Sequence, residues 1–300
     1  LLTFILRGYA QQEIITGVSV FLLAAFRLMP SINKLLTGFQ SLKFNSETIN
    51  KIHLEFKNNK DNDEIIKEAK ESKNEKIKFE NEILIKNISL SFPNREKILN
   101  DINFKIIKNE FIAITGPTGS GKSSLIAMII GLIQPTSGEI CIDKKNLNLN
   151  INSWQRQIGY VPQTLHFLDD TLKNNIAYGV HEEKIDNKQI EYCLEFSQLK
   201  KFVKNLDKGI NSTIGESALR ISGGERKRIG IARALYFKPS VLILDEPTNE
   251  LDAETEKKII DLLVKLKSEI TIILISHKES SFNSCDKIYK IENKKINLIK

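Results

Sequence analysis

A glycine-rich segment that ends in lysine and serine carries the strongest chemical signal in the sequence. The run Gly116-Pro-Thr-Gly-Ser-Gly-Lys122-Ser123 follows an apolar stretch at residues 111–115 and opens a helical stretch. Glycine lets a backbone wrap closely around phosphate, and the N–H groups at a helix start favour an anion. This order predicts a nucleoside triphosphate site, with Lys122 on the β- and γ-phosphates and the Ser123 hydroxyl on Mg²⁺. The expected nucleotide contacts are Gly116, Thr118, Gly119, Ser120, Gly121, Lys122, Ser123 and Ser124.

Two adjacent carboxylates follow a second apolar run. The residues Val241-Leu-Ile-Leu form a predicted buried strand, and Asp245 and Glu246 come directly after it. In a fold built around a phosphate loop, such a strand ends beside the loop, where Asp245 can hold Mg²⁺ through water. Glu246 then lies close to the γ-phosphate, so we expect it to act as the general base for an attacking water.

A third run, Ser222-Gly-Gly-Glu225, has two compatible interpretations. Ser-x-x-Glu is a capping box, a common way to begin a helix, and the apolar residues after it suit an ordinary packed helix. A capped helix start with two glycines also presents free N–H groups and a positive dipole to an anion. We expect that anion to be the γ-phosphate of a nucleotide bound elsewhere.

Residues 83–300 resemble a complete ATP-binding cassette (ABC) nucleotide-binding domain, with the motifs of that family in their usual order. Residues 116–123 match the Walker A motif, residues 241–245 match Walker B, and Glu246 matches the catalytic glutamate. Residues 222–225 match the signature motif. The resemblance implies that these four residues bind the ATP held by a second copy, through Ser222, Gly223, Gly224 and Glu225.

Three single residues extend this resemblance. Gln163 matches the Q-loop glutamine, which contacts Mg²⁺ and couples to membrane helices, and His277 matches the switch histidine that contacts the γ-phosphate. Phe92 stands where the family places an aromatic ring that stacks on adenine, with a strand-end core residue as the alternative. The implied cofactors are ATP and Mg²⁺. The resemblance assigns catalysis to Glu246, His277, Gln163 and Lys122, and metal binding to Ser123, Gln163 and Asp245.

The sequence departs from the family pattern around the signature and the D-loop (residues 249–252). The signature begins with Ile221 instead of Leu, and Glu225 replaces Gln. Asn249-Glu250 stands where Ser-Ala is usual, and Pro247 replaces the Ala that is commoner among exporters. Because Ser222 and Gly224 are intact, we expect ATP hydrolysis to be retained.

Composition supports a folded α/β protein and narrows its partners. The 300 residues are 41% hydrophobic and 27% charged, with a net charge of +7, which suits a substantial core beneath a lysine-rich surface. No basic cluster interleaved with aromatic residues stands out, so nucleic acid is not an expected partner. The three cysteines are widely spaced and form no CxxC pair, which argues against a zinc site.

Three zones divide the chain. Residues 1–56 are apolar and are predicted to be the C-terminal end of a transmembrane domain: two apolar segments flank a polar turn at residues 11–13, and a helix continues through residues 32–52. Lysine and arginine follow the second apolar segment, as expected at a cytoplasmic exit, although a buried helix of a soluble protein would look similar. Residues 57–82 are predicted to be a charged linker, and residues 83–300 the ATP-binding domain. We expect the chain to be the C-terminal part of a longer polypeptide.

The expected fold is α/β: a P-loop domain with a parallel sheet core, an antiparallel β subdomain and a helical subdomain, preceded by the helical end of a transmembrane domain. By resemblance, the chain is the ATPase of an exporter or flippase that acts as a homodimer in the inner membrane with its ATPase domain in the cytoplasm. Membrane lipids and a transported substrate are the other expected partners. Residues 23–33 resemble bacterial flippases for lipid-linked oligosaccharides. The alternatives are a multidrug, peptide or lipid exporter and, from another class, a non-transport ABC ATPase.

Overall fold

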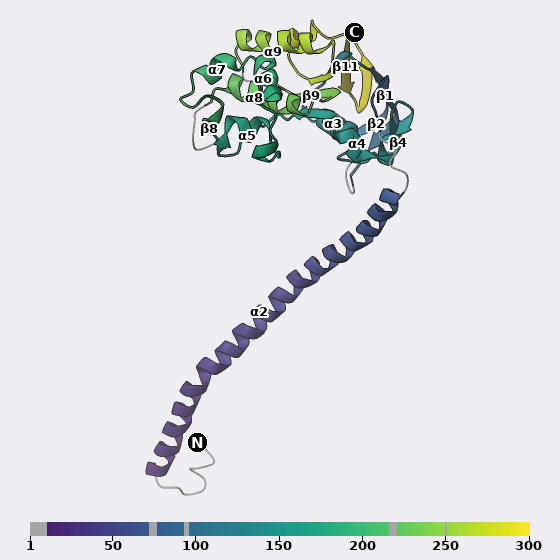
Figure 1. Cartoon of the computed structure of the whole chain (residues 1–300). Coiled ribbons are helices and arrows are strands. Elements are labelled where there is room, and N and C mark those ends of the chain that lie inside the picture. Colours follow the sequence, from purple (N-terminus) through teal and green to yellow (C-terminus); the bar gives the residue numbers. More distant parts are fainter. Residues whose placement is uncertain (1–10, 72–76, 93–95, 216–220, 250) are drawn as a thin grey trace. The chain divides into compact units, whose positions relative to one another are not determined.

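The computed structural model describes residues 11–71, 77–92, 96–215, 221–249 and 251–300. The chain divides into two units, Leu1–Asn74 and Glu75–Lys300, which are drawn in Figure 1 with several of their elements labelled. The second unit begins earlier than the 83–300 domain of the sequence analysis, because Ile77 and Phe79 are buried in it.

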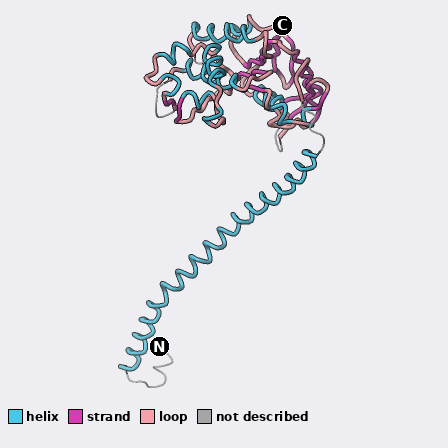
Figure 2. The backbone as a smooth tube through the Cα atoms, in the orientation of Figure 1, coloured by secondary structure: helices cyan, strands magenta, loops and turns pink. Residues whose placement is uncertain are grey.

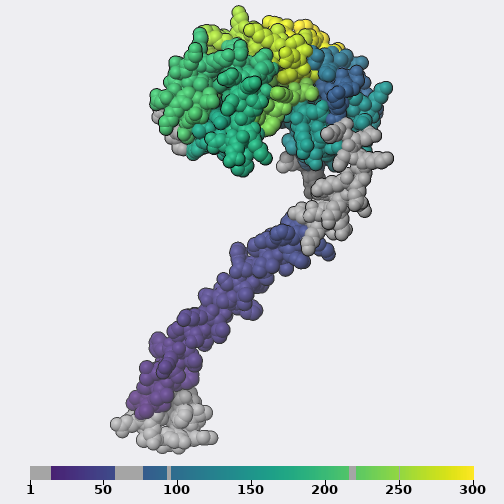
Figure 3. All heavy atoms as spheres, in the orientation of Figure 1, coloured from purple at the N-terminus to yellow at the C-terminus, as the bar shows by residue number. Residues whose placement is uncertain are grey.

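The described part of the first unit is one helix, α2 (Gln11–Glu71), which contains Pro30. The polar patch at residues 11–13, predicted to be a turn, is helical, consistent with the high helix propensity of Gln and Glu. The preceding apolar segment lies outside the described residues. The start of the expected linker, residues 57–71, is also helical. The large apolar side chains of α2 between Ile15 and Phe56 are more than half exposed, with the exception of Val18. Figure 3 draws this part of the helix as spheres in purple and blue. The segment Ile15–Lys57 is long and apolar enough to cross a membrane by length and composition.

A six-stranded sheet with the order β12-β11-β3-β10-β9-β6 forms the centre of the second unit. The pairs from β11 to β6 are parallel, and β12 is antiparallel to β11. Its strands are β3 (Phe111–Thr115), β6 (Ile158–Val161), β9 (Val241–Asp245), β10 (Thr271–Ile275), β11 (Lys287–Glu292) and β12 (Lys295–Leu298). The parallel core predicted from the sequence is therefore present, and its carboxyl edge carries the loops that follow Thr115, Asp245 and Ile275.

An antiparallel sheet with the order β2-β1-β4-β5 packs beside this centre. Its strands are β1 (Glu82–Leu90), β2 (Leu99–Ile107), β4 (Ser137–Ile142) and β5 (Lys145–Asn146). The predicted antiparallel β subdomain corresponds to this sheet, in which β1 and β2 form an antiparallel hairpin. The strand β4 is not among the elements predicted from the sequence, and its partner β1 lies about fifty residues earlier in the chain.

Most of the helices gather in a helical lobe at residues 172–236, on the side of the unit opposite most of the strands (Figure 2). The lobe contains α5 (Leu172–Ile176), α6 (Asn187–Phe196), α7 (Lys200–Lys204) and α8 (Gly223–Tyr236), and the short strands β7 (Asp170–Thr171) and β8 (Thr213–Ile214) pair at its edge. Outside it lie α3 (Lys122–Ile130), α4 (Ile151–Gln155) and α9 (Ala253–Leu266).

The central sheet is buried on both faces, which explains its continuous apolar runs. Along β3, Phe111 and Ala113 face the core that contains α8, α9 and the helical lobe. Ile112 and Ile114 face the core made with α3 and the antiparallel sheet. Sandwiching the sheet in this way fixes the positions of the strand ends, and with them the loops that carry the candidate site.

Candidate active site

The loop at residues 116–123 joins β3 to α3 in a conformation that depends on glycine. Gly116, Gly119 and Gly121 have φ values of 148°, 80° and 99°, in the region that residues with a side chain rarely adopt. A Cβ on Gly116 would lie 2.3 Å from the carbonyl oxygen of Ile291, and a Cβ on Gly121 would lie 2.9 Å from Leu99 Cδ2. The loop is therefore held tightly between β11 and β2.

The residues of this loop fit a phosphate group. Helix α3 begins without a side-chain cap among the described residues, so its first N–H groups remain available to an anion. The buried Ser120 hydroxyl has no hydrogen-bond partner in the described part of the chain. Lys122 Nζ donates to the carbonyl oxygens of Gly116 at 2.8 Å and Pro117 at 2.9 Å, positions that an incoming phosphate could take over.

Charges around Lys122 come from two strand ends. Burial lowers the pKa of Lys122, while Glu246 and Asp245 act in the opposite direction. Burial and the neighbouring Glu246 raise the pKa of Asp245, opposed by Lys122, Lys227 and a hydrogen bond with Tyr160. Asp245 is only 7% exposed at the end of β9. A carboxylate in these surroundings is a suitable partner for a divalent cation, because the added charge removes the cost of burying it.

Glu246 collects three side-chain donors. Its Oε2 accepts a hydrogen bond from Gln163 Nε2 at 2.7 Å and another from Asn249 Nδ2. Its Oε1 lies 3.0 Å from His277 Nε2. The φ of Glu246 is 49°, an uncommon value for a residue with a side chain, and its N–H donates to Ile275 O at 3.0 Å. The backbone thus turns sharply as β9 ends, and the carboxylate meets residues from three loops.

The structure brings together five of the residues singled out from the sequence. They lie at or beyond the carboxyl ends of the neighbouring strands β3, β10, β9 and β6. These residues are Lys122, Gln163, Asp245, Glu246 and His277. Since these strands are parallel, their carboxyl ends meet at one edge of the sheet. The spacing of the five residues along the chain does not predict this cluster; the order of the strands in the sheet produces it.

The Ser222–Glu225 motif caps α8 in the predicted way. Glu225 N donates to Ser222 Oγ at 3.3 Å, and Ser222 N donates to Glu225 Oε2 at 2.9 Å. The Ser222 hydroxyl also donates to Glu225 Oε2, at 2.7 Å. Within the described residues no hydrogen bond joins this motif to residues 116–123. Gly223 instead lines a cavity of about 630 Å³ together with Gln163 and Asn249.

Phe92 lies two residues beyond the end of β1 and is 38% exposed. Leu90 pairs with Leu99 at the start of β2, and Leu99 is the residue against which Gly121 packs. Phe92 therefore follows the end of the hairpin that contacts the phosphate loop. Stacking on adenine stays a prediction.

Two contacts at the site were not anticipated from the sequence. Asn249 was noted only as a departure from the family, yet its amide binds Glu246 three residues earlier. Tyr160, on β6, shares a hydrogen bond with Asp245, and burial and this carboxylate raise the pKa of Tyr160. Asn249 and Glu246 are only three residues apart, so their spacing could have indicated the contact. The contact between Tyr160 and Asp245 depends on the pairing of β6 with β9, which the spacing of the two residues does not indicate.

Comparison with known proteins supports a single family. The ABC transporter family model matches residues 99–249. The chain is 35% identical over 212 residues to a multidrug resistance ABC transporter ATP-binding and permease protein of Lactococcus lactis, covering 70% of this chain and 36% of that protein. It is 36% identical over 200 residues to an ATP-dependent lipid A-core flippase of Cupriavidus metallidurans, covering 66% and 34% of the two chains.

A solved structure agrees with these relatives. The structure of a bacterial Atm1-family ABC exporter with ATP bound superposes with a TM-score of 0.67 at 28% identity, over 72% of this chain and 38% of that chain. The chain thus spans roughly a third of the length of the relatives that it matches. With a family model that covers half of its residues and with the loop, strand ends and capped helix start described above, this chain belongs to the ABC transporter family.

Proposed function

We propose that the chain is the ATP-hydrolysing part of an exporter and that the cluster around Glu246 is its catalytic centre. The observation that carries the proposal is the meeting of Gln163, His277 and Glu246 at the sheet edge that also holds Lys122. A purely structural ion pair or helix cap needs only two partners. Here residues from the ends of four strands gather around one carboxylate beside a phosphate loop, which is the arrangement expected of a catalytic centre.

Each residue then has a role that its position supports. Lys122 and the N–H groups of the loop would bind the β- and γ-phosphates. Ser123, Asp245 and Gln163 would hold Mg²⁺, which when bound offsets negative charge on the phosphate oxygens. Glu246 would orient and deprotonate the attacking water, and His277 would donate a hydrogen bond to the γ-phosphate. Gln163 and His277 bind Glu246 in the structure, so they are positioned to exchange this contact for the nucleotide.

A second copy of the chain is the proposed partner. Residues 222–225 are not hydrogen-bonded to the phosphate loop of their own chain in the described structure, although their helix start suits an anion. A face-to-face pair would bring this motif onto the ATP held by Lys122 of the other copy. Hydrolysis is then expected from the pair, while a single copy only binds.

For the transported substrate we propose only a chemical class. The named relatives are a multidrug transporter, a lipid A-core flippase and an Atm1-family exporter, which favours amphipathic or lipid-like substrates. A lipid-linked oligosaccharide is the substrate suggested by residues 23–33. A multidrug, peptide or lipid exporter with the same ATPase is the alternative. Transport in proteoliposomes of the complete transporter, with each substrate class in turn, separates them.

Replacement of the base tests the ATPase. Glu246→Gln keeps the shape of the side chain but removes its basicity, so we expect ATP turnover to fall by about a hundredfold or more, while ATP binding persists and ATP-dependent dimers accumulate in size-exclusion chromatography. Glu110→Gln is the matched control, because Glu110 is similarly buried, with a side chain 16% exposed against 12% for Glu246, and precedes β3 at the opposite edge of the sheet. Undiminished turnover in Glu246→Gln would refute the proposed role.

A further inference from the structure

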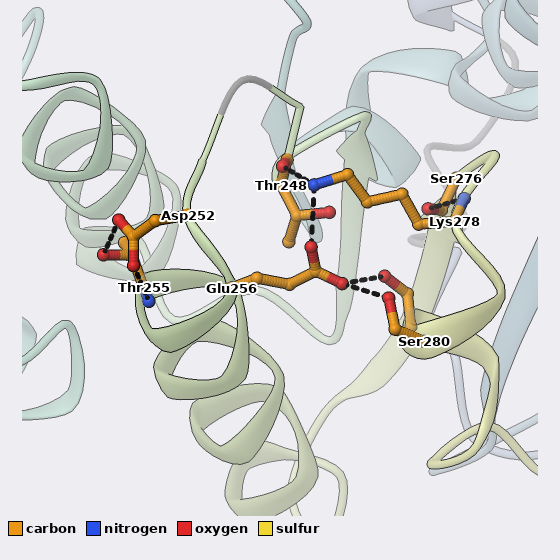
Figure 4. A network of polar contacts seen from close by, with 8 residues as sticks. Thr248, Asp252, Thr255, Glu256, Ser276, Lys278 and Ser280 are labelled. Carbon is orange, nitrogen blue, oxygen red and sulfur yellow. Dashed lines mark hydrogen bonds and ion pairs between the residues drawn. The ribbon is translucent and has the colours of Figure 1, made fainter.

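An ion pair with a buried carboxylate lies beside His277 and has no part in the proposed chemistry: the side chain of Lys278 is 34% exposed and that of Glu256 is 10% exposed. Glu256, in the first turn of α9, is only 7% exposed. Its Oε2 accepts a hydrogen bond from Lys278 Nζ at 2.7 Å. Its Oε1 accepts hydrogen bonds from the hydroxyl of Ser280 and, at 3.4 Å, from that of Ser281. Figure 4 shows this network with Lys278 reaching across from the loop after β10.

Lys278 also binds a third segment. Its Nζ donates to the carbonyl oxygen of Thr248 at 2.8 Å, and its own N–H donates to Ser276 Oγ at 3.1 Å (Figure 4). One ammonium group therefore connects the loop after β9, the loop after β10 and the start of α9. The first and third of these segments are continuous along the chain, whereas Lys278 is 30 residues from Thr248 and 22 residues from Glu256.

The connected loops are the ones that carry the catalytic centre. Lys278 directly follows His277, and Thr248 lies between Glu246 and Asn249. The last backbone hydrogen bond between β9 and β10 runs from Glu246 N to Ile275 O at 3.0 Å, and among the described residues no further backbone hydrogen bond joins residues 247–252 to residues 276–280. The ammonium group of Lys278 adds a link beyond this point. It binds the backbone of the loop after β9 through Thr248 O, and Lys278 itself belongs to the loop after β10. Glu246 Oε1 and His277 Nε2, which lie 3.0 Å apart, belong to the two backbones that Lys278 connects.

The charges in the network support each other. Burial alone would raise the pKa of Glu256, but the hydrogen bonds from Lys278 and Ser280 and the charge of Lys278 outweigh it, and the pKa is lowered. A carboxylate with donors on both oxygens has little freedom to rotate. The network is thus a rigid connection between α9 and the two loops.

Stability alone does not account for this arrangement. Even a fully buried ion pair is often no more stabilising than apolar residues of similar size, and this pair is partly exposed at Lys278, so its placement on catalytic loops calls for another explanation. The second unit contains a comparable pair, Lys287 and Glu110, with side chains 24% and 16% exposed. That pair lies at the amino ends of β11 and β3, at the edge of the sheet away from the catalytic centre, and provides an internal reference.

We propose that Lys278 and Glu256 are positioning residues for ATP hydrolysis, which hold His277 and Glu246 in the geometry that the reaction needs. The inference rests on the proposed ATPase function. Misplacement of catalytic groups by about 1 Å can cost around a hundredfold in rate. Within the described structure no hydrogen bond or ion pair joins the phosphate loop at residues 116–123 to this network, so nucleotide binding should be spared.

The test separates turnover from binding in the complete chain. For Lys278→Met we expect kcat to fall by about tenfold or more, with the dissociation constant of ATP within about twofold of the parent. Lys278→Arg should recover most of kcat, because a guanidinium can reach both acceptors. Lys287→Met should lower the melting temperature about as much as Lys278→Met but leave kcat unchanged. A kcat within about twofold of the parent in Lys278→Met, or an equal loss of kcat in Lys287→Met, overturns the proposal.

Two further variants cover a folding failure of Lys278→Met and a failure of the ATPase assignment itself. If Lys278→Met does not fold, Glu256→Gln keeps the side-chain shape and weakens the pairing, and it must also lower kcat with ATP binding unchanged for the proposal to stand. Glu246→Gln tests the function on which the inference rests. If Glu246→Gln turns over ATP normally, the ATPase assignment fails; if it is inactive while Lys278→Met is as active as the parent, only the positioning role fails.

Discussion

At the residue scale, the candidate site combines strained and buried groups that folding alone would not favour. Glu246 adopts a φ of 49°, and Asp245 is buried next to it. Asn249 adds a third donor to Glu246 at a position where the family usually has Ser. Such features cost stability, and active sites are where they are retained. We therefore expect the burial of Asp245 and the backbone conformation of Glu246 to lower the stability of the folded chain in exchange for function.

Asp245 gives a direct test of this trade. Burial and Glu246 raise the pKa of Asp245, so the ionised form is less favourable in the folded chain than in the unfolded chain. The free energy of unfolding contributed by this group is highest below the unfolded pKa and is lost as pH rises through the folded pKa. Asp245→Asn should raise the melting temperature at neutral pH, without nucleotide or Mg²⁺, by about 2–4 °C, and should abolish ATP hydrolysis.

The pH dependence provides the internal check on that variant. The advantage of Asp245→Asn should shrink as thermal unfolding is measured at progressively lower pH, because the parent carboxylate becomes protonated. Asp252→Asn serves as the control, since hydrogen bonds from Thr255 lower the pKa of Asp252 and its replacement should not raise the melting temperature. A lower melting temperature for Asp245→Asn at neutral pH would contradict this account.

At the element scale, α8 and α9 pack closely where the signature motif begins. Gly224 is buried at the start of α8, and a Cβ at this position would lie 2.7 Å from Thr255 Cγ2 on α9. Thr255 also donates through its hydroxyl to Asp252 at 2.7 Å, which completes the cap of α9 seen in Figure 4. The methyl group of Thr255 packs against the start of α8. The next residue, Glu256, binds Lys278 and Ser280 in the loop that contains His277.

This packing predicts a pair of compensating substitutions. Gly224→Ala should lower the free energy of unfolding by about 1–3 kcal/mol, because the added methyl overpacks against Thr255. Thr255→Ser removes the opposing methyl but keeps the hydroxyl that binds Asp252. The double variant should recover most of the loss in urea denaturation. If both substitutions destabilise additively, the contact between the two side chains is not the cause.

At the scale of the whole molecule, the two units differ in how much apolar surface they expose. The second unit buries most of its large apolar residues in two cores. At residues 15–57 of α2, every side chain except that of Val18 is exposed, and Phe21, Leu23 and Phe26 are between 70% and 75% exposed. Exposed apolar surface of this extent requires a membrane or a partner, which agrees with a helix able to cross a bilayer.

Removal of the first unit should separate membrane association from nucleotide binding. The complete chain is expected to float with liposomes in a density gradient, whereas residues 75–300 should stay in the aqueous fraction and bind ATP with an unchanged dissociation constant. Phe21→Ser, Leu23→Ser and Phe26→Ser together should weaken flotation without affecting binding. Recovery of the complete chain as a soluble protein without detergent would remove the support for a membrane role.

Local patterns were sufficient for the elements that build the site. The parallel strands β3, β9 and β10 follow from short β-branched runs, and the phosphate loop follows from glycine spacing between a strand and a helix. The capping box at Ser222 was also predictable, because Glu225 is three residues away. The strand β4 was not predicted, since it is stabilised by β1 from a distant part of the chain. The turn predicted at residues 11–13 was wrong because a polar composition does not interrupt a helix.

The sequence by itself determined the residue types, their order and the chemistry that they offer, since glycine spacing, adjacent carboxylates and a capped helix start act between neighbours along the chain. Only the tertiary structure decided which of them meet. The convergence of Gln163, Glu246 and His277 depends on strand order, and the connection of Lys278 to Glu256 and Thr248 spans 22 and 30 residues. Contacts of this kind are created by packing across a buried sheet, which no local pattern encodes.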